Sequence, residues 1–475
     1  MKVLFIHGDL CGQAGFNHGI AHLSAALKEA GHQALVITAN KAPAGALTDD
    51  ELLTRINAEK PGLVGFSAGG RLDQAIDLAK KVRRAFPHIP RIVGGAYATA
   101  DPRGALAAGV FDYACVGEGE EALVELAEAL AAGREATGIA GIWTWRDGAV
   151  LEGAPRGPVD LLKLPPKDYG ICDFQAAIDE SNGWAGLQAS RGRPAVGAGV
   201  SGGGCWAEGA ARQVRWYPVA SVIDDVRHIL GNYTNVRGFQ FEDEILTLDK
   251  KHLRELVAMY RQVTQLPFTC NSHVKCFDAE TARILADGGC RTVSFELGAG
   301  AARVRAQETH CEMTDAEIDA AFGSAGAAGL HTSAAVVVGA LGETVIEMDE
   351  TVRLVGRIAP GRFRWTVHDG GECADAAKGA RGGGAARLKR ELQVKKLSAA
   401  YPWYVNARSA DPLVRRLYSR LIRVVDGLDE EMFGGFEGEV PRLDALLHQV
   451  LVKAGRVHYS LRYDECTGVI STWND

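Results

Sequence analysis

The sequence predicts an α/β protein: an N-terminal doubly wound, Rossmann-like parallel sheet, then a partial parallel barrel, then a C-terminal mainly helical region. Two series of alternating apolar runs and amphipathic stretches predict this order, one from residue 2 to about 135 and one from residue 184 to about 367. Prolines cluster between the two series. We therefore expect a sheet domain at 1–150, a linker at 151–180, a barrel at 181–380 and a helical region at 381–475.

The first series consists of short apolar runs, each followed by a stretch with apolar residues at helical spacing. Such repetition is typical of a parallel sheet with covering helices. The run at 140–146 adds a further strand. The other predicted strands are 3–6, 34–38, 63–67, 91–93 and 113–116, with helices at 19–30, 72–85 and 120–132.

The second series has six strand-and-helix units, which suit a partial or full parallel barrel whose site lies at the carboxyl ends of the strands. Beyond it, helices are expected at 386–399 and 411–425, and the basic stretch 387–396 is interpreted as a solvated helix face. The predicted barrel strands are 186–190, 238–241, 268–270, 292–296, 332–338 and 364–367, with helices at 222–230, 252–262, 279–286, 315–325 and 347–358.

The length and net charge of the chain limit the classes of protein to which it can belong. A chain of 475 residues holds two or three domains at about 100–200 residues each. The balance of 52 basic and 59 acidic residues gives a net charge of −7, which argues against a nucleic-acid partner. No apolar run approaches the roughly 20 residues of a membrane span, and the N-terminus does not resemble a secretion signal. We expect a cytoplasmic protein whose ten cysteines are reduced.

Glycine-bearing loops end four of the first-series strands, at 8–12, 67–70, 94–96 and 117–120. Ligands of open parallel sheets bind at the carboxyl ends of strands, and glycine there lets a large ligand approach backbone N–H groups. A single loop of this kind is a plain tight turn as often as it is part of a ligand-binding site. Four at one edge favour a ligand-binding sheet.

Seven segments carry a resemblance to a known family. In the first part they are 61–67 (PGLVGFS), 92–99 (IVGGAYAT) and 115–121 (CVGEGEE). With the order of sheet domain and barrel, the chain resembles the cobalamin-binding radical-SAM enzymes over about residues 1–380. The barrel segments that resemble the family are 236–244 (VRGFQFEDE), 269–272 (TCNS), 289–296 (GCRTVSFE) and 342–344 (GET).

This resemblance implies a cobalamin cofactor on the loops of the first domain. The histidine signature that supplies a lower cobalt ligand in other cobalamin proteins is absent, so we expect no histidine ligand from the first loop. S-adenosylmethionine binding is left open. The residues implied to contact cobalamin are Asp9, Leu10, Cys11, Ser67, Ala68, Gly69, Gly94, Gly95, Ala96, Gly117, Glu118, Gly119 and Glu120.

The sequence departs from the family where an iron–sulfur cluster is held. Members hold the cluster through three cysteines on the loop after the first barrel strand, whereas Arg193, Gly197 and Val200 stand at those positions here. The family motifs at 298–301, 339–344 and 368–373 are altered too, to GAGA, GALGET and HDGGEC. We therefore expect no iron–sulfur cluster and no other bound metal. The glycine-rich stretch 197–204 is interpreted as a flexible loop at the barrel mouth.

Charged groups nevertheless remain at the predicted strand ends of the barrel, where catalytic groups of such folds collect. They favour a barrel with retained function over an inactive scaffold, although each one alone is more often a solvated or paired side chain. The candidate catalytic residues are Glu242, Asp243, Glu244, His273 and Glu296.

A zinc site is the competing interpretation of Cys270, His273 and Cys276, whose thiols and imidazole lie within seven residues. A fourth ligand is not evident, and the surrounding strand and helix signals already explain these residues.

Together these patterns predict a cobalamin-binding enzyme that modifies a small organic molecule by methyl transfer or by a cobalamin-assisted rearrangement. A non-catalytic cobalamin- or ligand-binding sensor with a companion protein is the alternative from another class. A radical-SAM enzyme with unconventional cluster ligation is the third.

Overall fold

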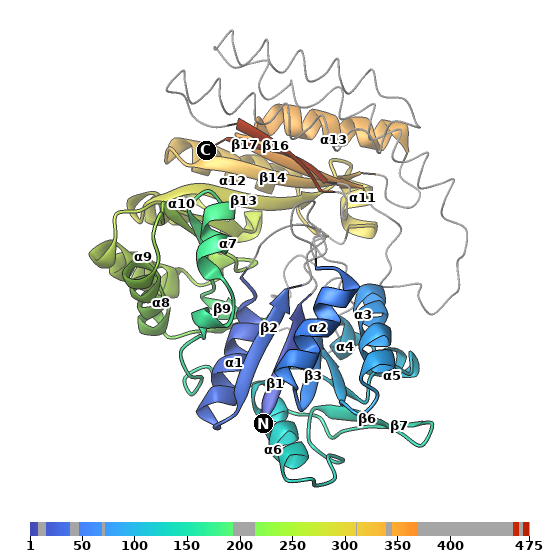
Figure 1. Cartoon of the computed structure of the whole chain (residues 1–475). Helices are drawn as coiled ribbons and strands as arrows, with labels where there is room; N and C mark the ends of the chain where they lie inside the picture. The colour runs from blue at the N-terminus through green and yellow to red at the C-terminus, as the bar shows by residue number, and fades with distance from the viewer. Residues whose placement is uncertain are drawn as a thin grey trace. The chain divides into compact units, whose positions relative to one another are not determined.

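The computed structural model describes residues 1–7, 16–38, 47–68, 72–192, 214–309, 311–338, 344–367, 459–464 and 469–474. Within it the chain divides into two compact units, the first ending at Glu242 and the second beginning at Asp243 (Figure 1). Among the described residues, no helix is both long and apolar enough to cross a membrane.

The first unit is built on a seven-stranded sheet of order β2-β1-β3-β4-β5-β6-β7. The first five strands run parallel, and β6 and β7 add an antiparallel hairpin at one edge. In this order the chain changes direction across the sheet between β1 and β3, the place where ligands bind in doubly wound folds. The strands are β1 (Lys2–His7), β2 (Gln33–Thr38), β3 (Leu63–Ser67), β4 (Arg91–Gly94), β5 (Tyr113–Cys115), β6 (Ile142–Arg146) and β7 (Ala149–Leu151).

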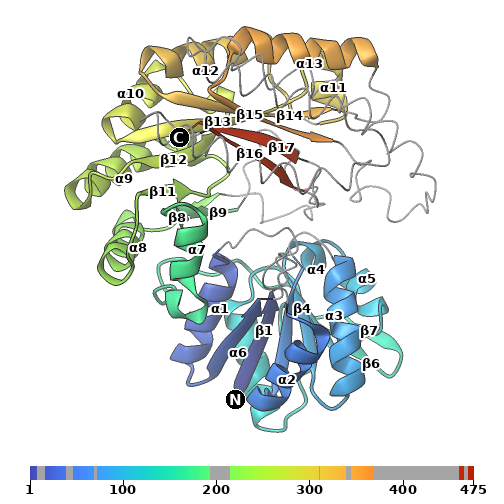
Figure 2. The same ribbon diagram turned by 45° about the horizontal axis from the view of Figure 1, so that its top comes forward.

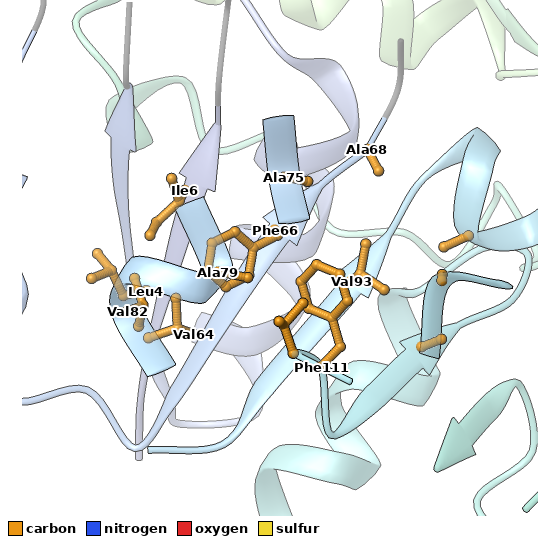
Figure 3. Packing of buried hydrophobic residues seen from close by; sticks show 14 of the residues in the cluster. Leu4, Ile6, Val64, Phe66, Ala68, Ala75, Ala79, Val82, Val93 and Phe111 are labelled. Atoms are coloured by element: carbon orange, nitrogen blue, oxygen red, sulfur yellow. The ribbon is translucent and has the colours of Figure 1, made fainter. Parts of the chain in front are cut away.

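Alternate side chains of the parallel strands enter two hydrophobic layers, one on each face of the sheet. Leu4 and Ile6 of β1 join the layer that packs against α3, as Figure 3 shows. Val3 and Phe5 of the same strand join the layer formed with α1 and α6. Because both faces are covered, the strands are apolar throughout, as expected for a parallel sheet. The covering helices are α1 (His18–Glu29), α2 (Asp49–Glu59), α3 (Leu72–Ala85), α4 (Ala96–Ala100), α5 (Pro102–Ala107) and α6 (Glu120–Ala131).

Local signals explain the element ends in this sheet. Thr48 and Glu51 form a reciprocal capping box at the start of α2. Asp147 and Gly148 both have positive φ, of 48° and 79°, which gives the tight two-residue turn between β6 and β7.

The first unit also contains the segment that leads toward the barrel. Strands β8 and β11 pair in parallel, and β9 and β10 form a short antiparallel pair. Apolar side chains on one face of α8 are buried. These elements are α7 (Phe174–Glu180), β8 (Trp184–Leu187), β9 (Ser190–Arg191), β10 (Arg215–Trp216), α8 (Val219–Asn232) and β11 (Gly238–Phe241).

The second unit contains four parallel strands in the order β12, β13, β14 and β15, followed by the antiparallel strands β17 and β16. Helices α10, α12 and α13 cover one face of these strands (Figure 2). The strands are β12 (Phe268–Ser272), β13 (Cys290–Gly298), β14 (His331–Val338), β15 (Arg362–Val367), β16 (Tyr459–Asp464) and β17 (Val469–Asn474), and the helices are α9 (Lys250–Val263), α10 (Ala279–Asp287), α11 (Ala302–Gln307), α12 (Asp315–Ala327) and α13 (Val345–Ile358).

The predicted fold class is confirmed: parallel strands and helices alternate in both units, with the predicted strands near their observed places. The predicted helices at 386–399 and 411–425 lie outside the described residues. Near the C-terminus the described residues form the β16–β17 hairpin, which the sequence did not predict. The predicted domain boundaries stay a prediction, while the structural division groups β8 and β11 with the first unit.

Candidate functional site

The carboxyl ends of the first-unit strands gather the predicted cofactor residues at one edge of the sheet. Ser67 at the end of β3 pairs with Gly94 at the end of β4. Residues 117–120 follow β5, the next strand in the sheet. Four of the predicted residues, Asp9, Leu10, Cys11 and Gly69, lie outside the described residues. The remaining nine therefore lie on three adjacent loops of a single edge.

Gly95 and Gly117 shape this edge through backbone conformations that other residues rarely adopt. Gly95 has φ +104°, and a Cβ there would lie 3.2 Å from the backbone carbon and oxygen of Ala68. Gly117 has φ +84° and donates its N–H to Oγ1 of Thr99 at 3.0 Å, and no heavy atom of the described residues lies within 4 Å of where a Cβ would stand. The edge thus combines tightly packed loops with open space above backbone, which suits a large ligand that approaches the main chain.

Glu118 and Glu120 at the same edge are engaged by arginines of β9 and β10. The Glu120 carboxylate, in a side chain 5% exposed, lies 2.6 Å from Nη2 of Arg191. Glu118 pairs with Arg215 and accepts a hydrogen bond from the backbone N–H of Val159 at 2.8 Å. Both carboxylates therefore hold the β9–β10 pair against the loop that follows β5. Their predicted contact with cobalamin stays a prediction.

A buried polar chain continues from Arg191 into helix α1. Arg191 donates from Nε to the hydroxyl of Tyr217, and that hydroxyl lies 3.0 Å from Nε2 of His22. The rings of His22 and Tyr217 are stacked with centroids 5.6 Å apart. Lys167 lies over the Tyr217 ring at 5.5 Å and pairs with Asp225 at 2.7 Å. Burial raises the pKa of Tyr217 to about 12, so its hydroxyl stays protonated.

His22 makes the stability of this unit depend on pH. Burial, with the nearby charges of Arg191 and Lys167, lowers the pKa of His22 to about 2. Between this value and the ordinary pKa of about 6.5, the unfolded chain binds a proton that the folded chain rejects, so stability falls as pH falls. We expect His22 to remove about 2 kcal/mol of unfolding free energy between pH 7 and pH 5.

Urea denaturation at pH 7 and pH 5 checks this expectation, with His22→Gln as the comparison. The variant should lose less stability than the wild type over the same pH interval. Equal losses in the two chains would show that His22 titrates normally in the folded state.

Glu242, the first of the candidate catalytic residues, follows β11 directly and continues its pairing with β8 by a backbone hydrogen bond to Leu187 at 2.8 Å. Its carboxylate is 42% exposed and lies 3.4 Å from Nε2 of His18 on α1. The Glu242 carboxylate also occupies the space next to Gly186 of β8, where a Cβ would lie only 2.5 Å from Oε1. The fold therefore places Glu242 beside a histidine of the first unit.

Three more candidates lie at the carboxyl edge of the second-unit strands. Asp243 is 4% exposed, and its carbonyl oxygen accepts a hydrogen bond from Nδ2 of Asn271 at 3.0 Å. Ser272 of β12 pairs with Phe295 of β13, so His273 and Glu296 each follow one residue later at the same edge. Glu244 is exposed. The structure therefore collects Asp243, His273 and Glu296 at one edge of this unit.

His273 is also held as the cap of a short 3₁₀ turn. Its Nδ1 accepts a hydrogen bond from the backbone N–H of Lys275 at 3.2 Å. Burial, and then the charge of Lys275, lower the pKa of His273, so the ring is neutral at pH 7. A neutral imidazole can accept a proton.

The altered segment 298–301 is fixed by a buried arginine. Arg305 of α11 is 1% exposed and donates to the carbonyl oxygens of Ala299, Gly300 and Met313, and to Asp315 at 2.6 Å. The backbone N–H of Gly300 donates to Oγ1 of Thr351 at 2.8 Å. Hydrogen bonds from Arg305 and to Thr351 thus hold the backbone of the loop after β13.

The Cys270, His273 and Cys276 side chains, considered as zinc ligands, do not form a metal site. Among the residues that the structure describes, no three histidine, cysteine or acidic side chains lie close enough to hold a metal ion. Cys270 instead lies beside Cys290, with 3.9 Å between the two sulfurs. The positions of the family's cluster cysteines, Arg193, Gly197 and Val200, lie outside the described residues, so the loss of the cluster stays a prediction from the sequence.

Sequence reasoning missed His18, Arg191 and Arg215, which contact the acidic residues, and Tyr217 and His22, which continue the polar chain from Arg191. One signal was available: His18 and His22 are four residues apart, which places them on one face of a helix. The arginine and tyrosine contacts join segments far apart in the chain, 97 residues for Glu118 and Arg215. No local pattern reveals such pairs.

Comparison with known proteins agrees with this geometry. Residues 11–127 match the model of the B12 binding domain. An uncharacterized methyltransferase of Pyrococcus horikoshii is 24% identical over 364 residues, which cover 75% of this chain and 76% of the relative. The anaerobic magnesium-protoporphyrin IX monomethyl ester cyclase of Rubrivivax gelatinosus is also 24% identical, over 388 residues that cover 78% of this chain and 68% of the relative.

Two solved structures share the fold. TsrM of Kitasatospora setae, a radical S-adenosylmethionine methyltransferase with cobalamin and a 4Fe–4S cluster bound, matches with a TM-score of 0.65 at 17% identity, covering 77% of this chain and 74% of TsrM. OxsB, a cobalamin-dependent S-adenosylmethionine radical enzyme, matches with a TM-score of 0.62 at 14% identity, covering 86% of this chain and 56% of OxsB. The chain therefore contains a B12-binding domain at residues 11–127 and shares the fold of these cobalamin-dependent radical S-adenosylmethionine enzymes.

Proposed function

We propose that this chain is a cobalamin-dependent enzyme that transfers a methyl group to a small organic molecule, in a barrel without a cysteine-held iron–sulfur cluster. The observation that carries the proposal is the coincidence of the B12-binding match with the glycine-shaped edge of the first sheet. The relative from Pyrococcus horikoshii, a methyltransferase by name, favours methyl transfer over rearrangement.

The residues at this edge fit a cobalamin. Ser67, Gly94, Gly95 and Gly117 offer backbone with little side chain to obstruct a flat macrocycle, and no described residue fills the space beside Gly117. Bound cobalamin supplies the chemistry of methyl transfer through its cobalt–carbon bond. The protein residues hold the ligand at the strand ends, and Arg191 and Arg215 fix the loop after β5 through Glu118 and Glu120.

The proposed absence of the cluster rests on the sequence. Cluster iron is held by cysteine thiolates, and Arg193, Gly197 and Val200 supply none. Without a cluster the reductive cleavage of S-adenosylmethionine has no electron source in this chain. Transfer of a methyl group as a cation to a nucleophilic substrate needs no such electron.

Metal analysis of the protein tests this function. The chain is purified without oxygen after growth with cobalamin, and its cobalt, iron and visible absorption are measured. One cobalt per chain without iron is the expected result. Several irons per chain would overturn the proposal in favour of unconventional cluster ligation, and a chain that binds neither metal would favour a scaffold or a sensor for another ligand.

Gly95→Ala should lower the affinity for cobalamin at least tenfold. The new Cβ would lie 3.2 Å from the Ala68 backbone in a conformation that side chains rarely adopt, so the two loops must separate. The control is Gly109→Ala: Gly109 also has positive φ, of 67°, but in the part of the chain that the structure describes no heavy atom lies within 4 Å of the new Cβ. Titration of each apo variant with hydroxocobalamin measures the affinity. Unchanged affinity in Gly95→Ala would remove this loop from the cofactor site.

A further inference from the structure

Glu242 is held by the fold in an unusual place for an acidic side chain. Its carboxylate lies over the backbone of β8 at Gly186, where any other residue would bring a Cβ within 2.5 Å of Oε1. The same absent Cβ would lie 3.6 Å from Nε2 of His18. Because Gly186 has no side chain, the Glu242 carboxylate and the His18 imidazole can lie next to each other there.

His18 is the buried member of this pair. Its side chain is 8% exposed, and Phe16 packs edge-on against its ring with centroids 5.0 Å apart. Among the described residues, neither ring nitrogen of His18 has a hydrogen-bond partner. The Oε2 atom of Glu242, at 3.4 Å from Nε2, is the acidic group within ion-pair distance. A buried polar ring without hydrogen bonds is rare in native proteins and calls for an explanation.

Glu242 itself is open to a reactant. Its side chain is 42% exposed, although its backbone is fixed by the hydrogen bond to Leu187. A carboxylate with one side against a fixed imidazole and another facing solvent can take a proton from a bound molecule. An ion pair this exposed contributes about 1 kcal/mol or less to the free energy of unfolding, so stability alone gives little reason for this arrangement.

We propose that Glu242 is the general base of the methyl transfer proposed above and that His18 is its positioning residue. The substrate's N–H, O–H or S–H bond breaks and its proton goes to the Glu242 carboxylate. The electron pair left on the substrate atom forms the new bond to the methyl carbon. The former bond of that carbon breaks, and its electron pair goes to the methyl donor, cobalamin. This inference rests on the proposed function for its donor and on the His18–Glu242 geometry for its base.

The pair is tested first without cofactor. Nuclear magnetic resonance of the apo chain with nitrogen-15-labelled histidine follows the ring nitrogens of His18, which are assigned by their loss in His18→Gln. In Glu242→Gln the Nε2 signal of His18 should move, because the adjacent charge is gone. The control Glu180→Gln, an exposed acid at the end of α7, should leave it in place. An unmoved signal in Glu242→Gln would overturn the pairing.

The base is tested on the cofactor-loaded chain. Each variant is loaded with methylcobalamin, its loading is checked by absorption, and loss of the methyl group to 2-mercaptoethanol is followed between pH 6 and pH 9. Glu242→Gln should lower the maximal rate about 100-fold or more, with little change in KM. Glu242→Asp should restore part of the rate, and His18→Gln should lower the rate less and alter its pH profile.

The outcomes separate the two proposals. A loaded Glu242→Gln chain as fast as the wild type would overturn the base and leave the cobalamin function standing. A loaded wild type no faster than free methylcobalamin would overturn the methyl-transfer function and the role of Glu242 as its base. The resonance comparison reports in either case whether His18 and Glu242 form a pair.

Discussion

Arg305→Met should lower the free energy of unfolding by about 3–5 kcal/mol. The arginine is 1% exposed and satisfies three buried carbonyl oxygens, those of Ala299, Gly300 and Met313. Methionine keeps an unbranched apolar stem but has no donor, so these buried oxygens lose their partner. Urea denaturation followed by circular dichroism measures the change.

Arg357→Met is the matched control, because Arg357 pairs with the same acid, Asp315, at 3.0 Å, but its side chain is 46% exposed. We expect this variant to lose about 1 kcal/mol or less. Similar losses in the two variants would show that the ion pair with Asp315, and not the buried carbonyl contacts, gives Arg305 its effect.

Arg191→Met should cost a similar amount, about 3–5 kcal/mol, for a different reason. It leaves the Glu120 carboxylate, 5% exposed, without the guanidinium that now lies 2.6 Å away. An unpaired buried charge is far more costly than a missing surface pair. The same replacement should weaken cobalamin binding, because Arg191 and Glu120 fix the loop after β5.

Two comparisons test this explanation. Arg156 contacts the same helix α6 through Glu121 and Glu125, whose side chains are 60% and 48% exposed, and Arg156→Met should cost about 1 kcal/mol. The double variant Arg191→Met with Glu120→Gln should recover part of the stability lost by the single one. A double variant that loses the sum of both single losses would contradict the paired-charge explanation.

The elements of both units followed closely from local pattern. The helix predicted at 72–85 and the strand predicted at 63–67 have the observed bounds. In each, the spacing of apolar residues follows from which side of the element is buried, so the local pattern was enough to predict it. Helix α2 was missed, since Leu52 and Ile56 are its only buried side chains and most of its other residues are polar. Its capping box at Thr48 and Glu51 was the available signal.

The site was predicted less completely than the fold. The glycines at 94–95 and 117 and the acid Asp243 lie at or just after strand ends, where the pattern of a parallel sheet places them, whereas Glu296 lies inside β13, two residues before its end. The partners of the acids were not predicted. Glu242 meets His18, and Glu120 meets Arg191, only because separate segments pack together.

By itself, the sequence determined the alternation of strands and helices, the sheet edges at which the glycines and acids stand, and the lack of thiols at positions 193, 197 and 200. Each of these features depends only on residues that are close together in the sequence: on which of them are apolar, and on the chemistry of their side chains. Only the tertiary structure decided which charges and histidines are buried together. That choice depends on contacts across the fold, which bury Glu120 against Arg191 and leave Glu242 half-exposed beside His18.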